Sequence, residues 1–157
     1  MAIFDELTAT STSQKFTPGA IRNINSRSYV YVQLSASAAN AAANGSVLYS
    51  TLADPNIVTD DISTSKTNLV RGVAIGAIAK GSYGWIQTWG SHGAVKTDGG
   101  DDIATGDAII GDTTVDGVCD SVAAGTAPTN KVLGFATATD SNTANTVAAY
   151  LTLERGD

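Results

Sequence analysis

The feature of this sequence that most restricts its fold is a series of short segments in which apolar residues alternate with polar or small ones. The clearest segment, Arg27–Ser35, reads RSYVYVQLS, so its tyrosines fall on one face of a strand and its valines on the other. Such segments recur at intervals of roughly 8 to 12 residues with turn-forming glycines between them, a spacing typical of β-sandwiches and β-barrels. We therefore expect an all-β fold.

Further segments along the chain carry the same pattern. Leu69–Gly90 predicts a tight hairpin, because β-branched residues alternate with small ones on both sides of Lys80-Gly81-Ser82. Asp116-Gly117 predicts a turn between two more short strands, Thr114-Val115 and Val118-Cys119. The remaining expected strands are Ser46–Leu52, Lys131–Thr139 and Asn145–Leu153, the last two joined by the polar link Asp140–Ala144.

Three segments lack a clear strand pattern. Residues 1–25 hold isolated apolar residues without a sustained period, which predicts an extended N-terminal arm. Ser35–Gly45 is rich in alanine and ends in a turn dipeptide, so its sequence is compatible with either a short helix or a loop. Ala53–Asn68 predicts a long surface loop. The expected architecture is a single domain, residues 26–157, built as a small β-sandwich or β-barrel of short antiparallel strands, with the arm and at most one short helix.

The charge and hydropathy of the chain disfavour several classes of protein. The net charge of −6 disfavours a protein that binds nucleic acid by neutralising phosphates. No apolar run approaches the roughly 20 residues that a bilayer requires, so no membrane span is expected. The N-terminus carries acids where a signal peptide needs lysine or arginine, so we expect no secretion signal and synthesis in the cytoplasm.

Side chains that could carry out catalysis are few. His92, the only histidine, follows Ser91, but adjacent residues of a strand point to opposite faces, and Gly90-Ser91-His92-Gly93 is not a Gly-x-Ser-x-Gly elbow. Cys119, the only cysteine, has no recognisable base beside it, so we expect it to be a small buried apolar residue. The sequence therefore predicts a protein that is not an enzyme and has no cofactor.

Aspartates gather in the second half of the chain. Seven occur with no lysine or arginine between them: Asp98, Asp101, Asp102, Asp107, Asp112, Asp116 and Asp120. They could supply oxygen ligands for calcium or a carboxylate pair for glycoside hydrolysis. The EF-hand order of ligands is absent, and aspartate is a common turn residue, so we expect solvated turns and leave calcium as the alternative.

The two tryptophans offer a large contact area. Trp85 and Trp89 lie four residues apart in one expected strand, so both should project from the same face. Packing in the core is one interpretation. The other is an exposed aromatic ridge that contacts a neighbouring subunit or a ligand.

Four motifs follow one another between Leu69 and Leu153: GVAIG from Gly72, GWIQTWG from Gly84, IATGDAIIG from Ile103 with Asp116-Gly117 after it, and VLGFA from Val132 before the final strand. In this order they resemble the head decoration, or cement, proteins of tailed bacteriophages. The resemblance implies a β-body on the outer capsid surface of the virion, the major capsid protein as partner, and commonly a homotrimer. It carries over no catalytic residue, and it implies no direct contact with nucleic acid or a membrane.

The same resemblance implies that the N-terminal arm reaches onto the major capsid protein. Phe4 and Phe16 would be its apolar anchors, and Lys15, Arg22 and Arg27 would pair with carboxylates of the shell. A disordered tail is the alternative, although it would leave both phenylalanines in water.

Two other functions stay open. A phage tail-tube, fibre or adhesin module would form rings or fibres in isolation. A carbohydrate-binding or hydrolytic β-sandwich would need Trp85 or Trp89 to be exposed beside paired aspartates.

Overall fold

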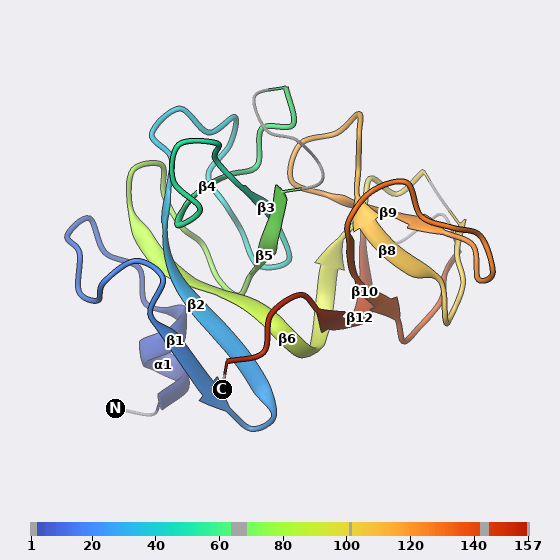
Figure 1. Ribbon diagram of the computed structural model, residues 1–157, viewed down its shortest axis with the longest axis horizontal. Helices are drawn as coiled ribbons and strands as arrows, with labels where there is room; N and C mark the ends of the chain where they lie inside the picture. The colour runs from blue at the N-terminus through green and yellow to red at the C-terminus, as the bar shows by residue number, and fades with distance from the viewer. Residues whose placement is uncertain (1–2, 64–68, 101, 142–144, 157) are drawn as a thin grey trace.

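The computed structural model describes residues 3–63, 69–100, 102–141 and 145–156, and it confirms the all-β fold (Figure 1). Among the described residues, no helix has the length and apolar character needed to cross a bilayer. The elements are α1 (Ile3–Thr8), β1 (Ile21–Ile24), β2 (Arg27–Leu34), β3 (Val47–Ser50), β4 (Ile57–Thr59), β5 (Val70–Ala74), β6 (Tyr83–Lys96), β7 (Asp102–Ile103), β8 (Ala108–Gly111), β9 (Cys119–Val122), β10 (Val132–Ala136), β11 (Asp140–Ser141) and β12 (Thr146–Thr152).

Strands β2, β4, β3, β5 and β6 form a closed barrel, which occupies the left half of Figure 1. Each pairs with the next, and β6 pairs with both β5 and β2, which closes the ring. All of these pairs are antiparallel except β2 with β4, which is parallel. Val30 and Val32 of β2 pack with Leu48 and Ile86 in the barrel core, as the alternation in the sequence predicts.

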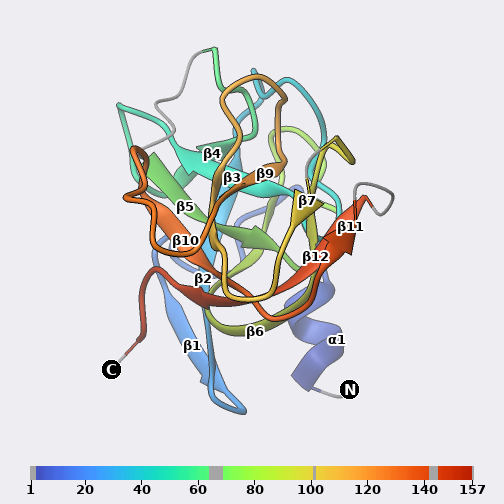
Figure 2. The same ribbon diagram turned by 90° about the vertical axis from the view of Figure 1, so that its right-hand side faces the viewer.

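A second antiparallel sheet grows out of the barrel through β6. This strand has 14 residues, and its far half pairs with β12, after which β10, β8 and β9 follow in order (Figures 1 and 2). The main core cluster joins the two parts, because Tyr49 and Val73 of the barrel strands pack with Ile109, Leu133 and Leu151 of the second sheet. Strands β7 and β11 form a separate pair.

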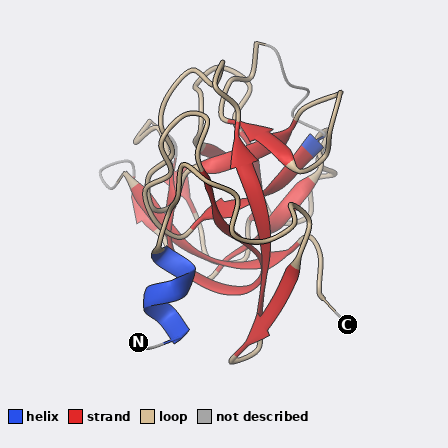
Figure 3. Ribbon diagram, turned by 90° about the vertical axis from the view of Figure 1, so that its left-hand side faces the viewer, coloured by secondary structure: helices blue, strands red, loops and turns tan. Residues whose placement is uncertain are grey.

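The N-terminal segment is docked on the barrel rather than free. It contains α1 and β1 on either side of an extended stretch, and Figure 3 shows α1 beside the lower end of the barrel. Leu7 of α1 is only 2% exposed and packs in one cluster with Tyr29, Tyr31 and Trp85. The segment therefore covers the tyrosine face of β2, so that both faces of this strand are buried.

The expected strand pairs are present, with local differences. β10 pairs with β12 as predicted. β5 pairs with β6, but their connection is not tight, because Ile78 within it forms a bridge to Ala42 and packs into the barrel. The second hairpin is β8 with β9, and Thr114-Val115 lies in its turn rather than in a strand.

Two segments that were predicted to lack strands both contribute residues to the barrel core. Ser35–Gly45 forms a loop, not a helix, and buries Ala38 and Ala42 in the barrel core. Ala53–Asn68 is not wholly a surface loop. It contains β4, where Val58 is buried, because the barrel needs a strand between β2 and β3. The end of this segment, 64–68, lies outside the described residues.

Candidate functional site: an aromatic strip and an arginine hollow

Strand β6 carries both tryptophans, and an irregularity in its pairing with β2 separates them. Trp89 lies opposite Ser28, whereas Gln87 lies opposite the next residue of β2, so Thr88 is the extra residue of a β-bulge. One extra residue shifts the alternation of faces by one. Trp85 and Trp89 therefore do not share a face, and the prediction from their spacing was wrong.

Trp85 lies in an aromatic cluster beneath the N-terminal segment and is only 2% exposed. The centroids of the Phe16 and Tyr31 rings lie 5.4 Å and 5.1 Å from that of Trp85. The guanidinium of Arg22 lies 5.1 Å from the Trp85 ring and donates a 2.7 Å hydrogen bond to the carboxylate of Glu6. Trp85 is thus a core residue of the single chain, and Phe16 and Arg22 help to hold the N-terminal segment over it.

Three aromatic rings form a row across β10, β12 and β6, which we call the aromatic strip: Phe135, Tyr150 and Trp89. Phe135 and Tyr150 are direct cross-strand partners, and they are 48% and 40% exposed. Trp89 is half-buried and meets Tyr150 edge-on, with 6.0 Å between ring centroids and 79° between ring planes. Exposed aromatic residues on neighbouring strands form an apolar patch of the kind found at contact surfaces.

A hollow of about 520 Å³ opens beside Trp89. We call it the arginine hollow, because the side chains of Arg27 and Arg155 line it. The guanidinium carbon of Arg155 lies 5.9 Å from the centroid of the Trp89 ring, a cation–π contact. Arg27 donates a 3.1 Å hydrogen bond to the hydroxyl of Ser91. The other lining residues are Asn23, Ile24, Asn25, Ser26, Ser28 and Gly156.

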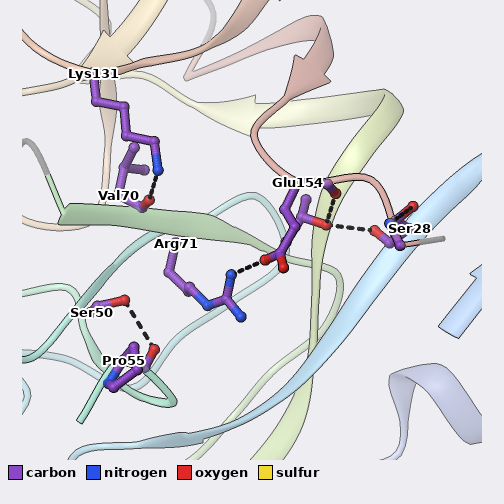
Figure 4. A network of polar contacts seen from close by, with 9 residues as sticks. Ser28, Ser50, Pro55, Val70, Arg71, Lys131 and Glu154 are labelled. Carbon is purple, nitrogen blue, oxygen red and sulfur yellow. Dashed lines mark hydrogen bonds and ion pairs between the residues drawn. The ribbon is translucent and has the colours of Figure 1, made fainter. Parts of the chain in front are cut away.

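Hydrogen bonds hold the C-terminal wall of the arginine hollow in place (Figure 4). The bulged Thr88 donates its hydroxyl to the carbonyl of Glu154 at 2.6 Å, and the Glu154 carboxylate forms an ion pair with Arg71 of β5. Farther along, the Gly156 amide donates to the hydroxyl of Ser28 at 3.1 Å. The β-bulge therefore has a structural role, because it turns Thr88 toward the C-terminal segment.

The opposite wall is the turn of the β1–β2 hairpin. Asn25 and Ser26 have φ angles of 50° and 63°, the left-handed pair that a type I′ turn requires. Gly90 of β6 lies against this turn with a φ of +89°, and a Cβ there would lie 2.7 Å from the carbonyl oxygen of Ser26. Any larger residue at Gly90 would push the hairpin away from β6, so glycine is needed to form this wall.

Charge is unevenly distributed along the chain. Residues 97–145 hold eight aspartates and one lysine, whereas the rest of the chain carries seven acidic and eight basic residues. The acidic stretch includes β7, β8 and β9, on the right of Figure 1, whereas the hairpin that carries Arg27 lies on the left. The arginine hollow is therefore formed at the less acidic part of the molecule.

The aspartates of the acidic stretch organise turns. Asp107 and Asp112 are buried rather than solvated, and backbone N–H groups donate hydrogen bonds to their carboxylates in place of water. Asp98 is exposed and accepts one such bond, from Gly100, and Asp101 lies outside the described residues. Within the described ranges, no three histidine, cysteine, aspartate or glutamate side chains converge as a metal site would require.

His92 lies beneath α1, where it and Leu7 help to line a cavity of about 260 Å³. The Ala94 amide donates to Nδ1 of the ring at 3.2 Å, so the proton of the neutral ring resides on Nε2, which faces the Ala74 carbonyl oxygen at 3.4 Å. Burial lowers the pKa of His92, and the nearby charge of Arg27 acts in the same direction. His92 is therefore a neutral structural residue, with both ring nitrogens engaged by the backbone.

Cys119 is buried in the core between the barrel and the second sheet, as expected. Burial raises the pKa of its thiol, and the neighbouring carboxylate of Asp120 raises it further. A thiol of this kind is mostly protonated at neutral pH and poorly nucleophilic.

The remaining predicted contact residues belong to three different parts of the chain: α1, the extended stretch after it, and β2. Lys15 is exposed, and its backbone amide donates to the hydroxyl of Tyr31 at 3.3 Å. Phe4 belongs to α1, but its side chain lies outside the described residues. Of the five predicted capsid-contact residues, Arg27 is the one among those that line the arginine hollow, and it belongs to β2 rather than to the N-terminal segment.

Sequence reasoning missed Phe135, Tyr150 and Arg155. A signal exists for Tyr150, because alternation in β12 sets it on the face opposite Ala149 and Leu151. Alternation alone would give Phe135 the same face as the buried Leu133, and the irregular register between Val132 and Gly134 breaks this pattern. No spacing rule identifies Arg155, which enters the site through the folding of the C-terminal segment.

No protein-family model, curated protein or solved structure matches this chain.

Proposed function

We propose that this chain is a structural virion protein of a tailed bacteriophage, a capsid decoration protein that binds the outer face of the expanded head and stabilises it by bridging major capsid subunits. The observation that carries the proposal is the aromatic strip, in which Phe135 and Tyr150 present their rings to solvent from paired strands. Exposed aromatic residues on a rigid scaffold supply contact area at little entropic cost.

Two of the motifs that resemble cement proteins support the proposal, because each contributes a residue of the strip. GWIQTWG lies on β6 and contains Trp89, and VLGFA is β10 and contains Phe135. A protein that binds only the expanded lattice favours that state by mass action, in proportion to its affinity and concentration. In this view the protein contributes a surface rather than a reactive group.

The proposal also specifies the contacts of the chain on the shell. Lys15 is an exposed charge available to carboxylates of the major capsid protein. Phe16 and Arg22 act indirectly, because they hold the N-terminal segment on the barrel. The chain assembles as a homotrimer on the capsid, and of the two tryptophans Trp89 is the one within reach of a neighbouring copy, since Trp85 is buried.

Binding to purified phage heads tests this function. We expect saturable binding to expanded heads stripped of decoration protein, and none to unexpanded heads. Absence of binding to any expanded head would contradict the proposal.

A carbohydrate-binding module is the second candidate, and the observation that favours it is the same exposed aromatic strip. The geometry is less suitable, because the rings of Trp89 and Tyr150 stand 79° apart and do not form a flat platform for a sugar ring. The residues that line the hollow beside Trp89 include no aspartate. Retention of the protein on polysaccharide resins, abolished by Tyr150→Ser, would favour this candidate.

A further inference from the structure

We propose that the arginine hollow is a binding site for a carboxylate, supplied by an acidic side chain of a partner protein whose adjacent apolar residue packs on Trp89. This inference rests on the proposed function only for the statement that the partner is a protein. The ligand chemistry follows from the side chains of the hollow.

The four arginines of the chain differ in whether they form an ion pair. Of the four arginines in the chain, Arg22 is paired with the carboxylate of Glu6 and Arg71 with that of Glu154. Arg27 and Arg155 form no ion pair with a described residue, and both line the same hollow. In an acidic protein, two guanidinium groups that have no carboxylate partner among the described residues therefore line one hollow.

The contacts of these two side chains leave donors available. Arg27 uses one nitrogen on the neutral hydroxyl of Ser91. Arg155 is exposed, and within the described part of the chain its guanidinium meets the Trp89 ring and forms no hydrogen bond. A guanidinium presents five N–H donors in a planar fork that matches the two oxygens of a carboxylate.

The other residues that line the hollow also suit an acidic side chain with an apolar residue beside it. No acidic side chain is among the described lining residues, so none of these residues repels an incoming carboxylate. Asn25 and Ser26 add polar groups at the rim, on a turn of fixed geometry. Trp89 belongs both to the hollow and to the aromatic strip, so an acidic residue followed by an apolar one would contact both features.

Preorganisation of the hollow favours binding. The C-terminal wall is fixed by the hydrogen bonds from Thr88 to Glu154 and from Gly156 to Ser28, and the Asn23 side chain donates to the Gly156 carbonyl at 2.8 Å. Little ordering of the protein is therefore needed when a carboxylate enters, which lowers the entropic cost of association.

A nuclear magnetic resonance titration of the full chain with two short peptides tests the inference. The probes are acetyl-Leu-Glu-Leu-amide and its neutral counterpart acetyl-Leu-Gln-Leu-amide. We expect saturable shifts of the Ser26 amide and the Trp89 indole N–H with the glutamate peptide, and affinity at least about tenfold weaker with the glutamine peptide, because hydrogen bonds to charged groups are among the stronger ones.

Variants and a third probe complete the test. Arg155→Gln should weaken binding of the glutamate peptide at least about tenfold, whereas Lys80→Gln, which removes a positive charge outside the hollow, should leave it unchanged. Equal responses to the two peptides, full affinity of Arg155→Gln, or preferential saturation by inorganic phosphate would each overturn the inference. Peptide binding without binding to heads would contradict the proposed function alone, and binding to heads without peptide binding would contradict this inference alone.

Discussion

The ring of Phe16 meets the ring of Tyr31 edge-on, with 5.3 Å between their centroids and 80° between their planes. Phe16 belongs to the N-terminal segment and Tyr31 to the barrel strand β2, so this contact ties the segment to the body. Aromatic pairs of this geometry contribute about 0.5–1.5 kcal/mol beyond the area that they bury. The N-terminal segment therefore contributes to the stability of the fold, whatever it also contacts on a shell.

Replacement of Leu7 measures that contribution. Leu7→Ala leaves a cavity over Tyr29 and Trp85, so we expect the free energy of unfolding in urea to fall by about 2 kcal/mol or more. The matched control is Leu52→Ala, because Leu52 is 76% exposed and its truncation should change stability by about 0.5 kcal/mol or less. Equal effects of the two substitutions would show that the N-terminal segment is not part of the cooperative unit.

The extent to which sequence predicts this fold depends on the range of the interactions involved. The alternation in β2 identifies the strand and its two faces, because that pattern is local. It does not show that the tyrosine face is covered, because the covering residues, Leu7 and Phe16, lie in a segment without a period. Similarly, the bulge at Thr88 leaves no local pattern, and without it the two tryptophans would share a face.

The candidate site is predictable in part for the same reason. Tyr150 follows the period of β12, so its outward face can be deduced from the sequence. Phe135 has the parity of the buried Leu133, and only its pairing with Tyr150 in the structure places it on the outward face. The arginine hollow joins the β1–β2 turn to Trp89 and Arg155, which are far apart along the chain. Only the tertiary structure brings these residues together.

Substitutions in the aromatic strip separate binding from folding. We expect the double variant Phe135→Ser, Tyr150→Ser to bind expanded heads at least about tenfold more weakly, because exposed aromatic residues commonly carry much of the binding energy. The cross-strand contact between these two residues is lost in the variant, which should reduce the free energy of unfolding by about 1 kcal/mol or less. Leu52→Ser, which removes an exposed leucine that is not part of the strip, is the control for binding. Unchanged affinity of the double variant would remove the strip from the proposed contact.

His92 makes the stability of the protein depend on pH in a defined direction. Its pKa in the folded chain lies below the ordinary value of 6.5, chiefly because of burial. As the pH falls below 6.5, the unfolded chain binds the proton first, so this residue's contribution to stability decreases until the pH passes the folded-state pKa. Urea unfolding between about pH 7.5 and about pH 5 measures the loss.

The variant His92→Gln isolates this effect from the titration of the carboxylates. Glutamine cannot be protonated in this range, so we expect the free energy of unfolding of the variant to depend less steeply on pH below 6.5 than that of the parent chain. An identical slope in both proteins would contradict the assignment of a neutral, buried ring.

Tyr49 presents a buried hydroxyl group whose removal should be tolerated. Within the described part of the chain, this hydroxyl has no hydrogen-bond partner, and burial together with the charge of Asp112 raises the pKa of the side chain. An unpaired buried hydroxyl costs about 1–3 kcal/mol of desolvation, so Tyr49→Phe should leave the free energy of unfolding unchanged or raise it by about 1 kcal/mol. Tyr31→Phe is the matched control, because the Tyr31 hydroxyl accepts a hydrogen bond from the amide of Lys15, and its loss should cost about 1 kcal/mol. A loss of stability in Tyr49→Phe as large as that in Tyr31→Phe would contradict the assignment of an unpaired Tyr49 hydroxyl.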